Sequence, residues 1–227
     1  MITFQPADIQ ARDLIVWMDD SIVVINKPSG LLSLPDGYDA AKPHLRSVLE
    51  PELGRLWIVH RLDRETSGLI VMARTARAHR SLNLQFDHGE VEKHYRGLIL
   101  GIPSWDSLRL QLPLKVNGDN RHRTVPDLLY GKPARSDFQV LARCQEYTWV
   151  DAVLHTGRTH QIRAHSAAIG HPLLCDRLYA RGLDVTHAGL NRLGLHAAQL
   201  CFSHPDLGTK LSFEIPLPND LAALDPP

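Results

Sequence analysis

One short segment concentrates side chains that can do chemistry: His60-Arg61-Leu62-Asp63-Arg64-Glu65-Thr66-Ser67-Gly68-Leu69. Asp63 stands just before an aliphatic run, where backbone N–H groups and hydroxyls can hold a carboxylate that faces a cleft. Gly68 allows another backbone to approach closely. The segment indicates a catalytic carboxylate, with Arg61 and Arg64 near it for phosphates or a displaced base. An aspartate that only caps a turn, beside solvated arginines, is the alternative.

Basic side chains gather in the C-terminal half, although the formal net charge is zero. Residues 152–175 contain no Asp or Glu but hold two arginines among four histidines, and residues 185–205, also without Asp or Glu, hold one arginine and three histidines. The arginines concerned, with two that flank His122, are Arg121, Arg123, Arg158, Arg163 and Arg192. Such a chain could present one positive face to phosphates. Solvated loop residues would give the same pattern.

Cysteine and histidine spacing argues against metal and disulfide frameworks. The three cysteines are far apart and form no C-x-x-C pair, which excludes a disulfide framework and a thiolate zinc site and fits a reducing compartment. His155, His160 and His165 recur at a spacing that groups them on neither a helix nor a strand face. No metal site is expected. The N-terminus lacks a signal pattern and the apolar runs are too short to span a bilayer, so we expect a soluble, cytoplasmic protein.

The elements that must position Asp63 mix strands and helices. Strands are predicted at residues 14–18 and 21–25, as a hairpin around Asp19-Asp20, and at Ser67–Ala73, Tyr95–Leu100, Phe138–Cys144, Tyr147–His155, Ala198–Ser203 and Leu211–Ile215. Helices are predicted from Pro43 to about Glu50, from the N-cap Thr75 to about Asp87 with Gly89 as a stop, and from about Thr159 to Ile169. Residues 26–30 form a turn. Strands predominate and most neighbours are antiparallel, so the fold class is α+β, in one domain over residues 1–227 with a core at about 14–215.

The pattern H-R-L-D-x-x-T-S-G-L resembles the signature of the RluA-type family of RNA pseudouridine synthases. Further segments resemble motifs of that family in the same order: Asn26-Lys27-Pro28-Ser29-Gly30-Leu31, Lys93-His94-Tyr95, Gly131-Lys132-Pro133-Ala134, Thr156-Gly157-Arg158-Thr159-His160-Gln161-Ile162-Arg163 with His165, Gly170-His171-Pro172-Leu173 with Asp176, and Leu195-His196-Ala197 ahead of His204-Pro205. The chain is therefore identified as a member of this family over nearly its whole length.

The resemblance implies a mixed, largely antiparallel sheet with the active site in a basic central cleft. Many members carry an S4-type RNA-binding domain before this core, and we expect none here, because only about a dozen residues precede the first strand. This favours a compact enzyme that acts on a stem-loop in ribosomal RNA, transfer RNA or both. We expect a monomer with no protein partner.

The resemblance also assigns roles to side chains. Pseudouridine formation breaks N1–C1′, joins C5 to C1′ and removes the C5 proton, so no cofactor or metal is required. Asp63 is the catalytic carboxylate, and Arg163 is the partner that keeps it ionised. Tyr95 lies against the uracil and serves the C5 proton transfer. Arg61 fills the gap left by the flipped uridine. RNA contacts are expected from Arg61, Arg64, Arg121, Arg123, Arg158 and His160.

Two other function classes are compatible with parts of the pattern. A metal-dependent RNA hydrolase would use the His and Asp side chains as ligands and would lose activity in chelator. A non-catalytic RNA-binding module would use the basic face alone and would tolerate loss of Asp63. The hydrolase lacks ligand spacing, and the binding module leaves the H-R-L-D segment unexplained.

Overall fold

The computed structural model describes residues 9–180, 182–187 and 189–224. The chain divides into two compact units, one from Met1–Glu92 with Ala197–Ile215 and one from Lys93–His196 with Pro216–Pro227. Both units are discontinuous in sequence, since residues 197–215 belong to the first unit and separate the two segments of the second. Asp63 belongs to the first unit, and Tyr95 and Arg163 belong to the second.

The first unit is built on antiparallel strands around a buried central pair. Its strands are β1 (Ile15–Met18), β2 (Ile22–Lys27), β3 (Trp57–Ile58), β4 (Ser67–Ala73), β11 (Leu195–Ser203) and β12 (Lys210–Glu214). The order is β1-β2-β4-β11, with β12 paired to β11 and β3 to β4. Every residue of β4 is buried. The predicted β1–β2 hairpin is confirmed, and the Asp19 carboxylate closes its turn by accepting from the Ser21 and Ile22 N–H groups.

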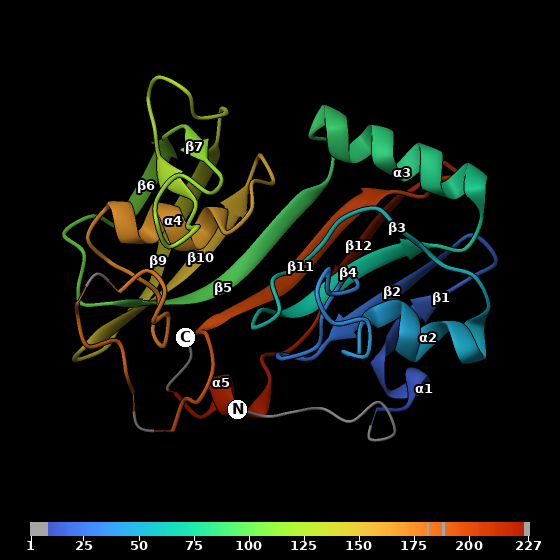
Figure 1. Cartoon of the computed structure of the whole chain (residues 1–227), viewed down its shortest axis with the longest axis horizontal. Helices are drawn as coiled ribbons and strands as arrows, with labels where there is room; N and C mark the ends of the chain where they lie inside the picture. The colour runs from blue at the N-terminus through green and yellow to red at the C-terminus, as the bar shows by residue number, and fades with distance from the viewer. Residues whose placement is uncertain (1–8, 181, 188, 225–227) are drawn as a thin grey trace. The chain divides into compact units, whose positions relative to one another are not determined.

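Three helices complete the described part of this unit: α1 (Ala11–Leu14), α2 (Leu45–Leu53) and α3 (Ala76–His88). The α3 helix lies beside β3 and β4 in Figure 1 and buries Ala78 and Leu82 in the core. Its predicted ends are confirmed, because Thr75 Oγ1 accepts from the Ala78 N–H and Gly89 has left-handed backbone angles. Leu14, predicted to start a strand, instead ends α1.

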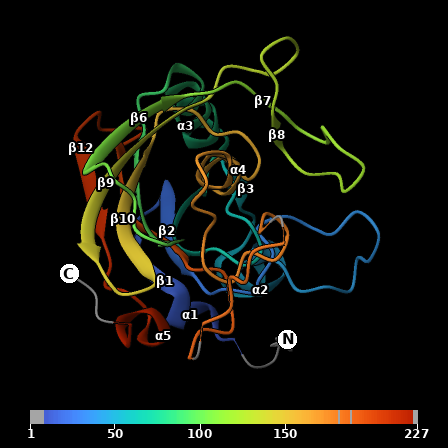
Figure 2. The same ribbon diagram turned by 90° about the vertical axis from the view of Figure 1, so that its left-hand side faces the viewer.

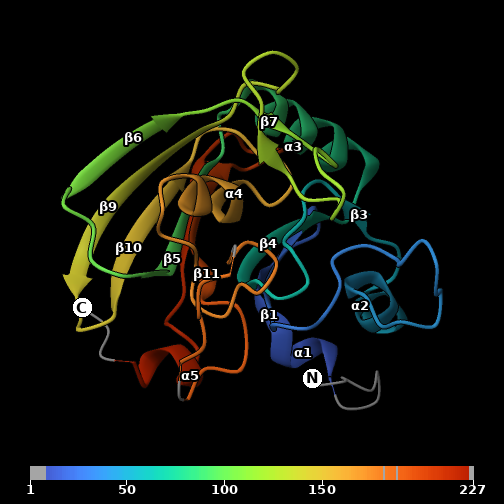
Figure 3. The same cartoon turned by 60° about the vertical axis from the view of Figure 1, so that its left-hand side comes forward.

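The second unit carries four antiparallel strands in the order β5-β10-β9-β6, visible side by side in Figure 3. They span Glu92–Leu100 (β5), Tyr147–Leu154 (β10), Arg135–Arg143 (β9) and Ser107–Gln111 (β6). The remaining elements are the β7–β8 pair (Leu114–Lys115 and Val125–Pro126), α4 (Gln161–Ala168) and α5 (Asn219–Ala222). The α4 helix contacts both β9 and β8, and Figure 2 shows it between them.

The α4 helix starts two residues later than predicted, and the Gln161 side chain explains why. Its amide oxygen accepts from the Arg158 N–H at 3.0 Å and from Thr156 Oγ1 at 2.7 Å, so residues 156–160 wrap around it as a turn. His160, the residue before the helix, has a left-handed backbone with φ of 54°. The predicted fold class is confirmed: a largely antiparallel sheet with few helices. That the chain forms one domain stays a prediction.

No helix among the described residues combines the length and apolar character needed to cross a membrane.

Gly68 marks a close approach of two backbones in the first unit. Its φ is +117°, and a Cβ placed there would lie 2.2 Å from the Ala197 carbonyl oxygen. We predict that Gly68→Ala lowers the free energy of unfolding by about 2–5 kcal/mol, the sum of the backbone cost and the overlap. Urea unfolding followed by tryptophan fluorescence measures this loss.

Gly208→Ala is the matched control, because Gly208 also has positive φ but an added Cβ would meet nothing within 4 Å. Gly208→Ala should therefore lower the free energy of unfolding only by the backbone cost of positive φ. Equal losses in the two variants would show that the Ala197 contact is not the cause.

Candidate active site

Asp63 lies in a turn that leads directly into β4. Its main-chain carbonyl accepts from the Thr66 N–H at 3.1 Å, which closes the turn. The Asp63 side chain is half-buried and Arg61, in the same turn, is exposed. The Thr66 hydroxyl is buried and has no hydrogen-bond partner among the described residues. The turn thus presents a carboxylate and a guanidinium from one rigid segment.

The predicted turn at residues 26–30 holds the Asp63 turn through its backbone. The Gly30 N–H donates to the Arg64 carbonyl at 2.7 Å, and Arg64 Nε donates back to the Gly30 carbonyl at 3.1 Å. Ser29 Oγ donates to the Glu65 carbonyl at 2.7 Å. The Arg64 guanidinium, predicted to contact RNA, therefore has a structural bond as well.

Lys27 is fully buried, and its ammonium reaches three carbonyl oxygens. Nζ donates to Pro28 at 2.9 Å, to Leu31 at 2.8 Å and to Arg64 at 3.2 Å. A buried charge needs such partners, because its desolvation is otherwise costly. Lys27 therefore connects the two turns directly.

Two further contacts fix the residues on the N-terminal side of Asp63. Ser33 Oγ donates to the Leu62 carbonyl at 2.8 Å and accepts from the Leu62 N–H at 3.1 Å. His60 Nε2 accepts from the Val71 N–H at 3.0 Å, and its ring stacks on Phe86 at 4.5 Å. His60 therefore connects the Asp63 turn to β4 and α3.

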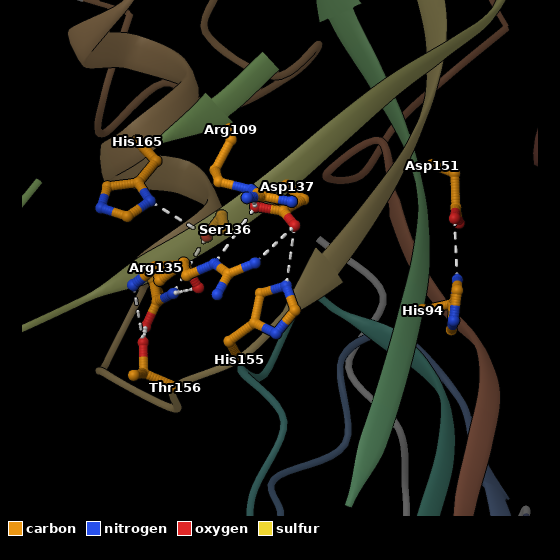
Figure 4. A network of polar contacts seen from close by, with 10 residues as sticks. His94, Arg109, Arg135, Ser136, Asp137, Asp151, His155, Thr156 and His165 are labelled. Carbon is orange, nitrogen blue, oxygen red and sulfur yellow. Dashed lines mark hydrogen bonds and ion pairs between the residues drawn. The ribbon is translucent and has the colours of Figure 1, made fainter. Parts of the chain in front are cut away.

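Tyr95 lies in the middle of β5 and is buried. It stands opposite Ala152 of β10. Its neighbours His94 and Arg96 point to the other face of these strands, where both contact Asp151. Figure 4 shows the His94–Asp151 contact. The alternation leaves the tyrosine ring on the face that carries Ala152.

Arg163 lies within α4 and is almost fully buried. Its Nε and Nη2 donate to the two carboxylate oxygens of Asp176 at 2.7 and 2.8 Å, a two-point ion pair. The guanidinium also lies 5.2 Å from the centre of the Tyr179 ring. Asp176 belongs to one of the family-like sequence motifs, which assigned it no role. The pairing of Arg163 with Asp63 stays a prediction.

Three predicted site residues contact Tyr179: Arg123, His160 and Arg163. The sequence motifs gave Tyr179 no role. Its hydroxyl accepts from the Thr124 N–H at 3.0 Å and bonds His160 Nδ1 at 3.1 Å. The Arg123 guanidinium lies 6.0 Å from its ring. Burial raises the pKa of Tyr179. Its spacing of three from Asp176, whose carboxylate accepts from the Tyr179 N–H, was the available signal.

The other residues predicted to bind RNA differ in the contacts that they already make within the protein. Arg123 is held by Asp119 at 2.7 Å, and Arg158 Nε donates to the Pro133 carbonyl at 3.0 Å. Arg121 is exposed. A guanidinium already paired with a carboxylate brings less net charge to a phosphate, which makes Arg121 the stronger candidate of the 121–123 pair.

The three histidines spaced by five have three different environments. His155 Nε2 contacts Asp137 at 3.0 Å, where Arg135 and Arg109 also meet, as Figure 4 shows. His160 contacts Tyr179, and buried His165 bonds Ser136 Oγ and the Leu112 carbonyl. Burial lowers the pKa of His165. No cluster of three or more His, Cys, Asp or Glu that could hold a metal occurs among the described residues.

Comparison with known proteins gives a consistent result. Residues 21–168 match the family model described as RNA pseudouridylate synthase. The chain is 38% identical over 205 residues to the dual-specificity RNA pseudouridine synthase RluA of Salmonella typhimurium, covering 89% of this chain and 92% of that protein. It is 38% identical over 220 residues to the ribosomal large subunit pseudouridine synthase D of Neisseria meningitidis, covering 91% of this chain and 59% of the relative.

A solved structure also shares the fold. The human RNA pseudouridylate synthase domain containing 4 superposes with a TM-score of 0.75 at 24% identity, covering 93% of this chain and 92% of the human one.

The Lys27 ammonium and its three carbonyl acceptors form a contact that we call the Lys27 clamp. This clamp predicts a local effect on the Asp63 turn. Lys27→Met keeps the bulk but removes the donors, so we expect a loss of about 1–3 kcal/mol in unfolding free energy. Amide hydrogen exchange should rise at Gly30 and Thr66, whose N–H groups close the two turns. Lys42→Met removes a lysine that is paired with Asp36 at the surface and should cost less than about 1 kcal/mol. Unchanged exchange in Lys27→Met would contradict the clamp.

The Arg163–Asp176 pair predicts a larger effect. Asp176→Asn leaves a buried guanidinium without its carboxylate, which costs about 3–5 kcal/mol. Asp184→Asn, at an exposed position of the same unit, should change the free energy by less than about 1 kcal/mol. Chemical denaturation compares the two. Equal stability of both variants would mean that the pair does not hold Arg163 in place.

Proposed function

We propose that this chain, which belongs to the RNA pseudouridylate synthase family, isomerises specific uridines in structured ribosomal or transfer RNA. Membership confirms the predicted family and enzyme class, an isomerase that converts uridine to pseudouridine in RNA. The observation that carries the proposal for this chain is Asp63, held by the Lys27 clamp in the turn before β4. The names of the relatives, which specify ribosomal and dual-specificity enzymes, support the RNA class.

The reaction leaves the composition of the nucleotide unchanged. The N1–C1′ bond breaks, C5 bonds to C1′, and the proton leaves C5 while N1 gains one. A carboxylate can attack the sugar, remove a sugar proton or stabilise positive character at C1′. We assign this role to Asp63. Its rigid turn would hold the carboxylate in one position during the reorientation of the base.

Tyr95 and Arg163 complete the proposed chemistry. Tyr95 would lie against the uracil and take part in proton transfer at C5, using its π-face and its phenol. Arg163 would keep Asp63 ionised, because a guanidinium holds its charge throughout the working pH range. The ion pair with Asp176 uses two of the five guanidinium donors. Asp176 would thus orient the arginine.

Arg61 would enter the gap left when the uridine flips out of its loop. The exposure of its side chain and its place in the Asp63 turn support this role. Phosphates would be held by Arg64, Arg121, Arg123, Arg158 and His160 along a basic cleft. We further propose that the enzyme works in the cytoplasm as a monomer.

The proposal predicts that the protein releases tritium from transcribed ribosomal or transfer RNA labelled at uridine C5, with EDTA present. Asp63→Asn should lower this release by at least ~10²–10⁴-fold, because the amide loses charge and nucleophilicity. RNA affinity should be nearly unchanged, because the amide keeps the shape. Asp20→Asn, in the exposed β1–β2 turn, is the control and should keep full activity.

Full turnover by Asp63→Asn would overturn the assignment. Activity that disappeared in EDTA and returned with zinc or magnesium, with the RNA kept folded, would favour a metal-dependent hydrolase instead.

A further inference from the structure

Three consecutive large side chains are exposed at a turn that follows β8. The exposed fractions are 78% for Leu128, 84% for Leu129 and 76% for Tyr130. Apolar surface concentrated in this way commonly marks an interaction site. None of these residues takes part in the proposed chemistry, and the sequence motifs gave them no role. Figure 2 shows the β7–β8 segment standing apart from β9 and β10, with α4 between them.

The turn that carries these side chains is closed by hydrogen bonds. The Asp127 carboxylate accepts from the Leu129 N–H at 3.0 Å and from the Tyr130 N–H at 2.8 Å. The Gly131 N–H donates to the Asp127 carbonyl at 3.0 Å, and the Asp127 N–H donates to Pro113 at 3.0 Å. A Cβ at Gly131 would lie 2.2 Å from the Asp127 carbonyl oxygen. The backbone is therefore fixed while the three side chains point outward.

Basic residues outnumber acidic ones in the sequence around the turn, although Lys115 also pairs with Asp127 at 3.7 Å. Lys115 Nζ lies 5.3 Å from the centre of the Tyr130 ring. Residues 114–135 contain five Lys or Arg and two Asp, a formal charge of five minus two, or +3, although Arg123 pairs with Asp119 and Arg135 with Asp137 outside this range. Lys132 directly follows the turn and is exposed. Exposed Tyr38, in the first unit, differs in this respect because Asp36 and Asp39 flank it.

We propose that Tyr130 is a stacking platform for an unpaired base of the RNA substrate, with Leu128 and Leu129 packing beside that base. Single-stranded nucleic acid is bound by aromatic side chains on which bases stack, next to cations that follow the phosphates. The excess of positive charge selects RNA over a neutral or basic protein surface. This inference rests on the proposed function, since it assigns a second contact on the same substrate.

The test measures affinity and is independent of turnover. The probes are a fluorescein-labelled RNA hairpin with a uridine-rich loop and a fully paired duplex of matched length, both followed by fluorescence anisotropy. Tyr130→Ala should weaken hairpin binding roughly 5- to 150-fold, the range for loss of one base–aromatic stack, and leave duplex binding unchanged. Tyr130→Phe keeps the ring and should bind as wild type does.

Two variants separate stacking from charge. Lys132→Gln should lower the slope of log affinity against log salt by about 0.7–0.9 for both probes, the value for one phosphate contact. Tyr38→Ala removes another exposed tyrosine, from acidic surroundings, and should leave the binding of both probes unchanged. Leu129→Ser should also weaken hairpin binding and leave duplex binding unchanged.

Unchanged hairpin affinity in both Tyr130→Ala and Leu129→Ser would overturn the inference. A wild-type dimer that Tyr130→Ala dissociates, with hairpin affinity unchanged, would assign the turn to self-association and also overturn it. Hairpin binding that depends on Tyr130 without any tritium release would instead remove the proposed function and leave the platform standing.

Discussion

Three backbone carbonyls converge on the ammonium of Lys27, and this arrangement constrains everything around Asp63. A charge inside protein is tolerated only where its donors are satisfied, because desolvation otherwise costs several kcal/mol. The carbonyl of Arg64 can reach Lys27 only when the Asp63 turn has one conformation. The carbonyls of Pro28 and Leu31 fix the other side in the same way. A buried cation thus converts two loops into one rigid support for a carboxylate.

In the second unit a buried charge is also satisfied, here by an ion pair. Asp176 and Arg163 satisfy each other in a buried two-point pair, and the Tyr179 ring lies against the guanidinium. Tyr179 in turn bonds His160, so the start of α4 and the loop after it are held together. The Asp63 turn in the first unit and Arg163 in the second are therefore both held in place by buried charge.

Local signals predicted most of the framework, since they depend on neighbours in sequence. The aliphatic run of Ser67–Ala73 gave β4, and Thr75 with Gly89 gave both ends of α3. The β6 strand was missed, although its alternating polar and apolar residues between Pro103 and Pro113 are a strand signal, because only five residues carry it. The start of α4 was misplaced, because the Gln161 side chain captures the preceding backbone, and propensity does not record such a bond.

In the candidate site, too, local motifs predicted individual residues but not their tertiary contacts. Motif resemblance identified Asp63, Tyr95 and Arg163 as individual residues. It could not show which contacts each makes, because Asp176 and Tyr179 reach Arg163 through tertiary packing that one sequence does not encode visibly. Lys27 was recognised only as part of a turn, and its burial makes it a support.

The discontinuity of the first unit has a consequence for biosynthesis. Residues 1–92 leave the ribosome before the strand that covers β4 exists, since Ala197 comes 105 residues after Glu92. At about 5–20 residues per second, the nascent chain waits roughly 5–20 s with that edge uncovered. An uncovered strand edge is a template for wrong pairing. A chaperone that shields nascent chains would therefore matter most during this interval, before the last strands emerge.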